Sequence, residues 1–365
     1  MTQPRCEMIF EQSIKSEHTR VNYLRCMKKF KRFVGVENLD ELLYSDQKAI
    51  QEKVEDYVIF LKNKINPNSF GAQLAPVFLF YSLNDVTLNK VKIKKMFPAR
   101  IKVQGFNAYT REDVRMMLDN TTKKRGRAMV LIFASTGCRV GGLIDLTMKD
   151  ISDVPNSDCK CLRFYTGFPE EYYSFLTPEA TNFLYEYLQE RIDNGEKFTD
   201  DTPVISSYGR YNIKYTKHIT KSMPMTRLAI SHALEHMLKK QKRSRDVGGR
   251  FSIPTTHGFR KYFNRTLKMR EGCNLSICEK LMGHSVTISL DNSYLPLNRE
   301  ELFAEFENAI PDLTIREDER QLLRINQLEK DRRSEEDKEK ENKLLKEEME
   351  ILKLRIQRIE LSKEQ

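Results

Sequence analysis

The sequence contains no run of about 18 apolar residues, and this absence excludes a membrane-spanning helix. Its first ten residues, MTQPRCEMIF, lack the apolar core of a secretory signal peptide. The 7 cysteines are scattered, and the one close pair, Cys159 and Cys161, lacks the paired spacing of a zinc site. We therefore expect reduced thiols, a cytoplasmic location, and neither a membrane nor a bound metal.

Positive charge is concentrated before the last 50 residues. The chain has a formal net charge of +10, yet residues 313–365 hold 14 basic and 15 acidic residues, so residues 1–312 carry +11. Six basic residues and no acid lie within 90–102, and five basic residues lie within 239–245. Such an excess is typical of proteins that bind nucleic acids. The candidate DNA contacts are Lys90, Lys92, Lys94, Lys95, Lys239, Lys240 and Lys242.

The length of 365 residues and the hydrophobic patterns predict three parts. Residues 1–98 are expected to form a small helical DNA-binding domain, with helices over 46–65 and 69–83, and 90–102 to form a basic linker. Residues 99–312 are expected to form a second domain, and 313–365 a charged helical tail.

The second part combines helix caps with one strand pair. Thr110 and Asp113 form a capping box, and Thr177 followed by Pro178 begins another helix. Residues 161–165 and 172–176 read as two strands of a hairpin. The fold class is therefore predicted to be mainly α with a small antiparallel β-hairpin, an α+β arrangement.

The tail contains apolar residues that alternate in steps of four and three, which is the seam of a coiled coil. These residues are Leu345, Met349, Leu352, Ile356 and Ile359. A seam this short also fits a solvated helix, so self-association through the tail stays open beside that interpretation.

Four short segments carry the residues for a chemical reaction. Arg139 follows a Thr-Gly pair, His257 and Arg260 lie three residues apart, His284 follows a glycine, and Tyr294 comes ten residues later. Two guanidinium groups match the oxygens of a phosphate, and a histidine on the same helix face transfers protons. A tyrosine, whose pKa is near 10, needs such a cationic site to act as a nucleophile. The set predicts phosphoryl transfer to Tyr294.

The order and spacing of these segments resemble the signature of tyrosine recombinases, the phage and archaeal integrases and their Xer-type relatives. The resemblance implies a core-binding domain before a catalytic domain, double-stranded DNA as substrate, a tetramer on DNA, and a mobile genetic element as origin. It implies that Tyr294 forms a 3′-phosphotyrosine link and releases a 5′-hydroxyl. Arg139 and Arg260 would hold the non-bridging oxygens, His257 would act as general acid and base, and His284 would donate to the phosphate. No cofactor, ATP or metal is implied.

The sequence departs from that pattern at two places. Family members usually have an acidic residue three after the first arginine, where this chain has Gly142; Asp145 or Asp150 is the expected substitute. Members also place a lysine on or near the hairpin to protonate the leaving 5′-hydroxyl. The turn here contains none, and the nearest candidate is Lys160.

Other functions remain open from the sequence. A type IB topoisomerase uses the same chemistry, and a non-catalytic DNA-binding protein would tolerate both departures. His232, Glu235 and His236 form an HxxEH pattern that is found in zinc peptidases. That segment also fits an ordinary amphipathic helix with Leu228, Leu234 and Leu238, which is the simpler interpretation.

Overall fold

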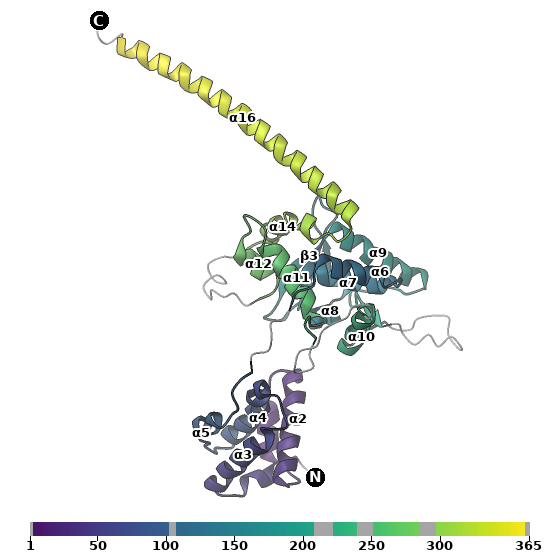
Figure 1. Ribbon diagram of the computed structural model, residues 1–365, viewed down its shortest axis with the longest axis vertical. Coiled ribbons are helices and arrows are strands. Elements are labelled where there is room, and N and C mark those ends of the chain that lie inside the picture. Colours follow the sequence, from purple (N-terminus) through teal and green to yellow (C-terminus); the bar gives the residue numbers. More distant parts are fainter. Residues whose placement is uncertain (1–2, 102–106, 208–221, 239–250, 285–296, 362–365) are drawn as a thin grey trace. The chain divides into compact units, whose positions relative to one another are not determined.

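The structure is a computed structural model that describes residues 3–101, 107–207, 222–238, 251–284 and 297–361 (Figure 1). The chain divides into two compact units, Met1–Val103 and Gln104–Gln365, and each has its own apolar core. The finer division into 1–98, 99–312 and 313–365 stays a prediction. In the described part of the chain, no helix is both long enough and apolar enough to cross a bilayer.

The first unit is a bundle of helices around aromatic side chains. Asp46 caps the helix over the predicted 46–65 segment by accepting from the Ala49 backbone N–H. Phe30, Tyr57 and Tyr81 meet at tilted and edge-on angles in the core. The elements are α1 (Arg5–Gln12), α2 (Glu17–Val34), η1 (Asp40–Leu43), α3 (Gln47–Leu61), η2 (Pro67–Ser69), α4 (Phe70–Leu83) and α5 (Lys90–Lys95).

Helix α5 corrects the expectation that 90–102 is only a linker. It packs against α3, and Ile93 is fully buried. The Lys92 ammonium lies 2.7 Å from a carboxylate oxygen of Glu55 and lowers the pKa of that carboxyl group. Lys90, Lys94 and Lys95 are exposed. The first residues of this basic stretch are therefore part of a folded unit, and Lys92 already has an anionic partner.

The second unit is organised around α7, which is buried over most of its length and packs against α6, α9, α11 and β3 (Figure 1). The predicted capping box of Thr110 and Asp113 is present at α6. The helical elements are α6 (Arg111–Asp119), α7 (Lys124–Thr136), α8 (Val140–Asp145), η3 (Met148–Asp150), α9 (Pro178–Asp193), α10 (Arg227–Met237), α11 (His257–Lys268), α12 (Leu275–Leu281), α14 (Arg299–Glu307), α15 (Ile310–Leu313) and α16 (Glu317–Leu361).

The predicted hairpin is present as the core of a three-stranded antiparallel sheet in the order β1-β2-β3. Phe164 at the end of β2 pairs with Tyr172 at the start of β3, which leaves residues 165–171 to form the turn between them. The strands are β1 (Ile151–Asp153), β2 (Lys160–Phe164) and β3 (Tyr172–Leu176), with a separate pair β4 (Ser206–Ser207) and β5 (Met223–Pro224). The predicted class, mainly helical with a small antiparallel sheet, is confirmed.

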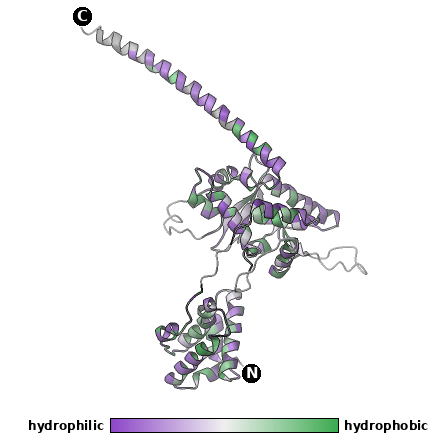
Figure 2. Ribbon diagram, in the orientation of Figure 1, coloured by the Kyte–Doolittle hydropathy of each residue, from purple (hydrophilic) through white to green (hydrophobic). Residues whose placement is uncertain are grey.

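The C-terminal helix α16 (Glu317–Leu361) is anchored through the two residues that precede it. The buried Glu179 carboxylate accepts hydrogen bonds from the backbone N–H groups of Ile315 and Arg316, at 2.7 and 3.1 Å. Farther along, the helix is mainly hydrophilic (Figure 2), and the seam residues Leu345 and Met349 are exposed. The other seam side chains lie outside the described ones, so the coiled coil stays a prediction.

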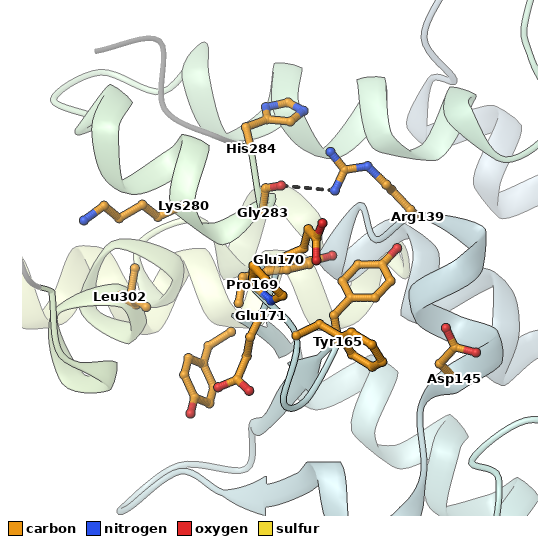
Figure 3. Close-up of a pocket in the computed structure, with 13 residues that line it drawn as sticks. Arg139, Asp145, Tyr165, Pro169, Glu170, Glu171, Lys280, Gly283, His284 and Leu302 are labelled. Atoms are coloured by element: carbon orange, nitrogen blue, oxygen red, sulfur yellow. Dashed lines mark hydrogen bonds between the residues drawn. The ribbon is translucent and has the colours of Figure 1, made fainter. Parts of the chain in front are cut away.

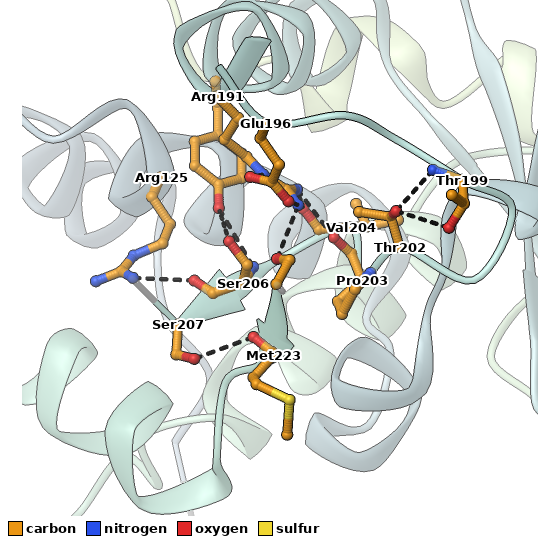
Figure 4. Close-up of polar contacts among 12 residues, drawn as sticks. Arg125, Arg191, Glu196, Thr199, Thr202, Pro203, Val204, Ser206, Ser207 and Met223 are labelled. Carbon is orange, nitrogen blue, oxygen red and sulfur yellow. Dashed lines mark hydrogen bonds and ion pairs between the residues drawn. The ribbon is translucent and has the colours of Figure 1, made fainter. Parts of the chain in front are cut away.

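A buried ion pair joins the end of α9 to the segment before β4 (Figure 4). Arg191 forms two hydrogen bonds to the Glu196 carboxylate, at 2.8 and 2.5 Å. Its guanidinium also donates to the carbonyl oxygens of Pro203 and Val204, both at 2.9 Å. The side chains of Arg191 and Glu196 are 5% and 6% exposed, so each depends on the other to satisfy its charge.

Replacing Arg191 with Met should lower the free energy of unfolding of this region by about 3–5 kcal/mol, because it leaves a buried carboxylate without a partner. The measurement is hydrogen exchange of α9 peptides across a urea series. Lys149→Met is the control, since it removes an exposed pair with Asp201 (50% and 81% exposed) and should change nothing measurable. Equal protection in the two variants would contradict this account.

Candidate active site

Arg260 is the most constrained of the predicted site residues. It lies on α11 with 6% of its surface exposed. Its guanidinium donates to the carbonyl oxygen of Gly137 at 2.8 Å and to that of Met282 at 2.5 Å. Gly137 ends α7 in the left-handed conformation (φ 58°), which turns the chain into α8. Segments that are more than 100 residues apart in the sequence are thus joined at one side chain.

Arg139 lies at the turn into α8 and is half-buried. Its Nη1 donates to the carbonyl oxygen of Gly283 at 3.1 Å (Figure 3). Arg139 and Arg260 therefore hold successive carbonyls, those of Gly283 and Met282. Within the described residues, neither guanidinium forms an ion pair with a carboxylate. Two uncompensated positive charges side by side favour an anion.

The backbone conformation and the close packing at position 283 require a glycine. Its φ is 59°, and a Cβ atom built on it would lie 2.3 Å from Cδ1 of Tyr172. A side chain here would push apart the turn that places the Met282 and Gly283 carbonyls and the ring of Tyr172 on β3.

His257 is the first residue of α11 and keeps an exposed face. Partial desolvation, followed by the charges of Arg260 and Arg139, lowers the pKa of His257 below its usual value. The imidazole is therefore neutral near pH 7 and is able to accept a proton.

His284 is oriented by a carboxylate that the sequence analysis missed. Its Nδ1 is hydrogen-bonded to Glu279, which also binds Lys268. The bonds to Lys268 and His284 keep the pKa of Glu279 below its usual value against the opposing effect of burial. An ionised carboxylate only accepts, so Nδ1 carries the proton and Nε2 faces away from it. Glu279 lies five residues before His284 in the sequence, a spacing that no simple motif records.

Arg139, His284 and the hairpin turn line one cavity (Figure 3). Arg260 is buried and His257 is exposed, and neither lines this cavity. Tyr294, Lys239, Lys240 and Lys242 lie outside the described residues. The lining residues are Arg139, Asp145, Tyr165, Phe168, Pro169, Glu170, Glu171, Tyr172, Tyr173, Lys280, Gly283, His284 and Leu302.

The two expected substitutes for the missing acidic residue do not hold Arg139. Asp150 is buried and accepts hydrogen bonds from Thr147 and from Thr166 Oγ1, the latter at 2.6 Å. Asp145 lines the cavity but lies apart from Arg139 in Figure 3, and the structure gives no ion pair between these two described residues. Desolvation raises the pKa of Asp145.

Lys160 lies at the opposite end of the hairpin from the turn. It pairs in register with Leu176, forms an ion pair with Asp153, and lies 5.3 Å from the ring centre of Tyr185. It does not line the cavity. The structure therefore argues against Lys160 as the group that protonates a leaving oxygen at this site.

The HxxEH pattern lies on α10. His232 and His236 are exposed, while Ile230, Leu234 and Met237 are buried, so the helix is amphipathic as the simpler interpretation expects. Leu228, which was expected on the apolar face, is 65% exposed. No group of three metal-ligating side chains occurs in the described ranges.

Comparison with known proteins identifies the family. The family model described as "Phage integrase family" matches residues 107–301, more than half of the chain. The chain belongs to the phage integrase family. This confirms the resemblance on which the sequence prediction rested, and the protein is an enzyme of the tyrosine recombinase class that acts in site-specific DNA recombination.

Two solved structures share the fold. The Tn1549 transposon integrase in complex with circular intermediate DNA is similar to this chain with a TM-score of 0.53 and 15% identity, over 83% of this chain and 98% of that one. A lambda integrase(75-356) dimer bound to a COC′ core site also gives 0.53, with 17% identity over 78% and 94%. A search of curated protein sequences found no match.

Gly283→Ala should destabilise the site far more than Gly272→Ala. Both glycines have positive φ, 59° and 73°, but a Cβ atom on Gly272 would meet nothing within 4 Å. We expect Gly272→Ala to cost about 1–2 kcal/mol of unfolding free energy from backbone strain alone. Gly283→Ala adds the clash with Tyr172, so its cost should be larger by about 1–3 kcal/mol.

The measurement is urea unfolding, with hydrogen exchange followed on peptides from α12. If both variants lose the same stability, Tyr172 does not restrict the backbone at Gly283.

Proposed function

We propose that this recombinase cleaves DNA by attack of Tyr294 on a phosphate held by Arg139 and Arg260, forming a 3′-phosphotyrosine link. A 5′-hydroxyl from a second strand then displaces the tyrosine and rejoins the DNA. The assignment of these residues rests on the motifs and on the geometry around Arg139 and Arg260.

The observation that carries the proposal is the absence of carboxylate partners for both arginines within the described residues. Their donors instead bind the carbonyls of Gly137, Met282 and Gly283, which fix the guanidinium groups without cancelling their charge. Fixed donors of this kind stabilise the extra negative charge on a pentacoordinate phosphate. Neither ATP nor a metal ion enters this scheme.

His257 and His284 have different roles in proton transfer. Neutral His257, beside Arg260, is suited to take the proton of the attacking tyrosine. His284 faces the cavity with its Nδ1 occupied by Glu279, so its Nε2 donates to a phosphate oxygen only when the ring is protonated. A bound phosphate favours that protonated form.

The partners follow from the same proposal. Double-stranded DNA is the substrate, and strand exchange between two sites requires self-association, proposed here as a tetramer on DNA. The names of the two solved relatives place each of them on DNA, and one of them as a dimer. A cytoplasmic location is part of the proposal because the substrate is DNA.

Nicked duplexes with randomised sequence upstream of the nick provide the direct test. Cleavage releases a short strand, so the covalent adduct accumulates and survives SDS. We expect wild-type protein to form the adduct and Tyr294→Phe to form none, because the variant lacks the oxygen that attacks phosphorus. Sequencing the trapped DNA would also identify the target.

Tyr185→Phe serves as the matched control, since Tyr185 is 46% exposed and does not line the cavity. It should form adduct at the wild-type rate. If Tyr294→Phe forms as much adduct as wild type, the assignment of the nucleophile is contradicted. If wild-type protein forms no adduct, the proposed catalysis is contradicted and the alternative of a non-catalytic DNA-binding protein is favoured.

The exposed lysines of α5 should contribute to the salt dependence of DNA binding. The triple variant Lys90→Gln, Lys94→Gln, Lys95→Gln should reduce the slope of log K against log salt by about 2–3, because each phosphate contact contributes about 0.9. Lys92→Gln should change the slope less, since Lys92 is paired with Glu55. Fluorescence anisotropy with an arbitrary duplex measures both, and an unchanged slope in the triple variant would remove α5 from the interface.

A further inference from the structure

Tyr165 has a backbone conformation that its residue type rarely adopts. It directly follows β2 and has φ 55°. The other described non-glycine residues with positive φ are Asp85 and Asn156, whose residue types tolerate this region better than a tyrosine does. The strain costs about 1–3 kcal/mol and persists only where the surroundings enforce it.

The turn around Tyr165 is braced on several sides. The Phe168 backbone N–H donates to the Tyr165 carbonyl at 3.0 Å, and Thr166 Oγ1 donates to buried Asp150 at 2.6 Å. Across the turn, Glu171 accepts from the Gly167 backbone N–H and from Arg163, both at 2.8 Å. These bonds fix the direction in which the Tyr165 side chain leaves the turn.

That direction leads to Arg139. Tyr165 lines the cavity with Arg139 and His284, and Figure 3 shows its phenol pointing toward Arg139. The positive charge of Arg139 acts on the phenol and favours its ionised form. Burial is the larger effect and raises the pKa of Tyr165, so the phenol keeps its proton near neutral pH.

Gly142 makes room for this ring. A Cβ atom built on Gly142 would lie 3.5 Å from Tyr165 Cζ and 3.0 Å from Phe164 Cδ1. One built on Gly141 would lie 3.4 Å from the phenolic oxygen. An acidic side chain at position 142 would therefore need the space that the phenol fills. The two departures from the family pattern, the glycine at position 142 and the hairpin turn without a lysine, are thus in contact with each other in the structure.

We propose that Tyr165 is a catalytic residue that donates the proton to the leaving 5′-oxygen. The inference rests on the proposed function. A tyrosine and a lysine have similar ordinary pKa values, near 10 and 10.4, so a phenol is a suitable acid where the hairpin carries no lysine. The adjacent Arg139 stabilises the phenolate that the transfer leaves behind.

Each proton released in cleavage returns to its donor in rejoining. Tyr294 Oη forms a bond to phosphorus and gives its proton to His257, while the bond from phosphorus to O5′ breaks and O5′ takes the phenolic proton of Tyr165. During rejoining, the incoming 5′-hydroxyl returns a proton to the Tyr165 phenolate, its oxygen bonds to phosphorus, and Tyr294 leaves and recovers its proton from His257.

A leaving group that needs no proton provides the test. In a duplex with sulfur at the bridging 5′ position, the leaving thiol has a pKa near 8.5, against about 16 for an alcohol-like oxygen. Tyr165→Phe keeps the ring against Gly142 and removes only the acid. We expect it to form adduct roughly 10²-fold or more slowly than wild type on the oxygen substrate, and at close to the wild-type rate on the sulfur substrate.

Two control variants complete the experiment. All variants are assayed on the duplex sequences that wild-type protein traps from the randomised nicked duplexes described above. Tyr185→Phe changes an exposed tyrosine that does not line the cavity and should match wild type on both substrates. Lys280→Met tests the lysine of the cavity, and a sulfur-specific rescue of this variant instead of Tyr165→Phe would overturn the proposal.

The remaining outcomes are equally decisive. Wild-type rates from Tyr165→Phe on oxygen, or equal slowing on both substrates, would overturn the role of Tyr165 as the acid. Failure of wild-type protein to form adduct on either substrate would contradict the proposed function itself, and with it this inference.

Discussion

The site depends on how two guanidinium groups are held by backbone carbonyls and, among the described residues, by no carboxylate. Arg260 binds the carbonyls of Gly137 and Met282, and Arg139 binds that of Gly283. Carbonyl dipoles orient the arginines but leave their net charge available to a ligand. A carboxylate partner would orient them equally well and would weaken the field that an incoming phosphate meets.

The glycines and the sheet serve that arrangement. Gly137 and Gly283 both adopt positive φ, and the turns they form present the carbonyls to the arginines. Tyr172 on β3 fills the space beside Gly283, and Phe263 on α11 lies against Gly137, so packing fixes each turn. The hairpin adds Tyr165, whose strained backbone places a phenol beside Arg139 in the space that Gly142 leaves. The site is therefore a property of the packed second unit and not of one motif.

Much of this organisation was predictable from the sequence, for physical reasons. The capping box at Thr110 and the Thr177-Pro178 start of α9 are local signals, and the structure contains both. The spacing of the Arg139, His257, Arg260 and His284 motifs led to the family, because four motifs in order are specific even where each alone is weak.

The remainder depends on contacts that sequence patterns do not record. Asp150 was expected to support Arg139, but its carboxylate accepts hydrogen bonds from Thr147 and Thr166. Lys160 lies at the end of the hairpin away from the turn, because the strand register and not closeness in sequence decides its position. Glu279 reaches His284 across the turn that ends α12, and Tyr165 meets Arg139 and Gly142, which come from a different part of the sequence. The basic stretch after residue 90 appeared to be a linker because its single buried residue, Ile93, is too sparse to reveal a helix.

The central claim is that the arginines position a phosphate for Tyr294, and peptide mapping of the covalent adduct tests it most directly. The adduct would be digested with protease and nuclease, and the peptide that retains a nucleotide would be sequenced by mass spectrometry. The account predicts a phosphotyrosine at Tyr294, linked to the 3′ end of the cleaved strand. A nucleotide on any other residue, or a link to a 5′ end, would contradict it.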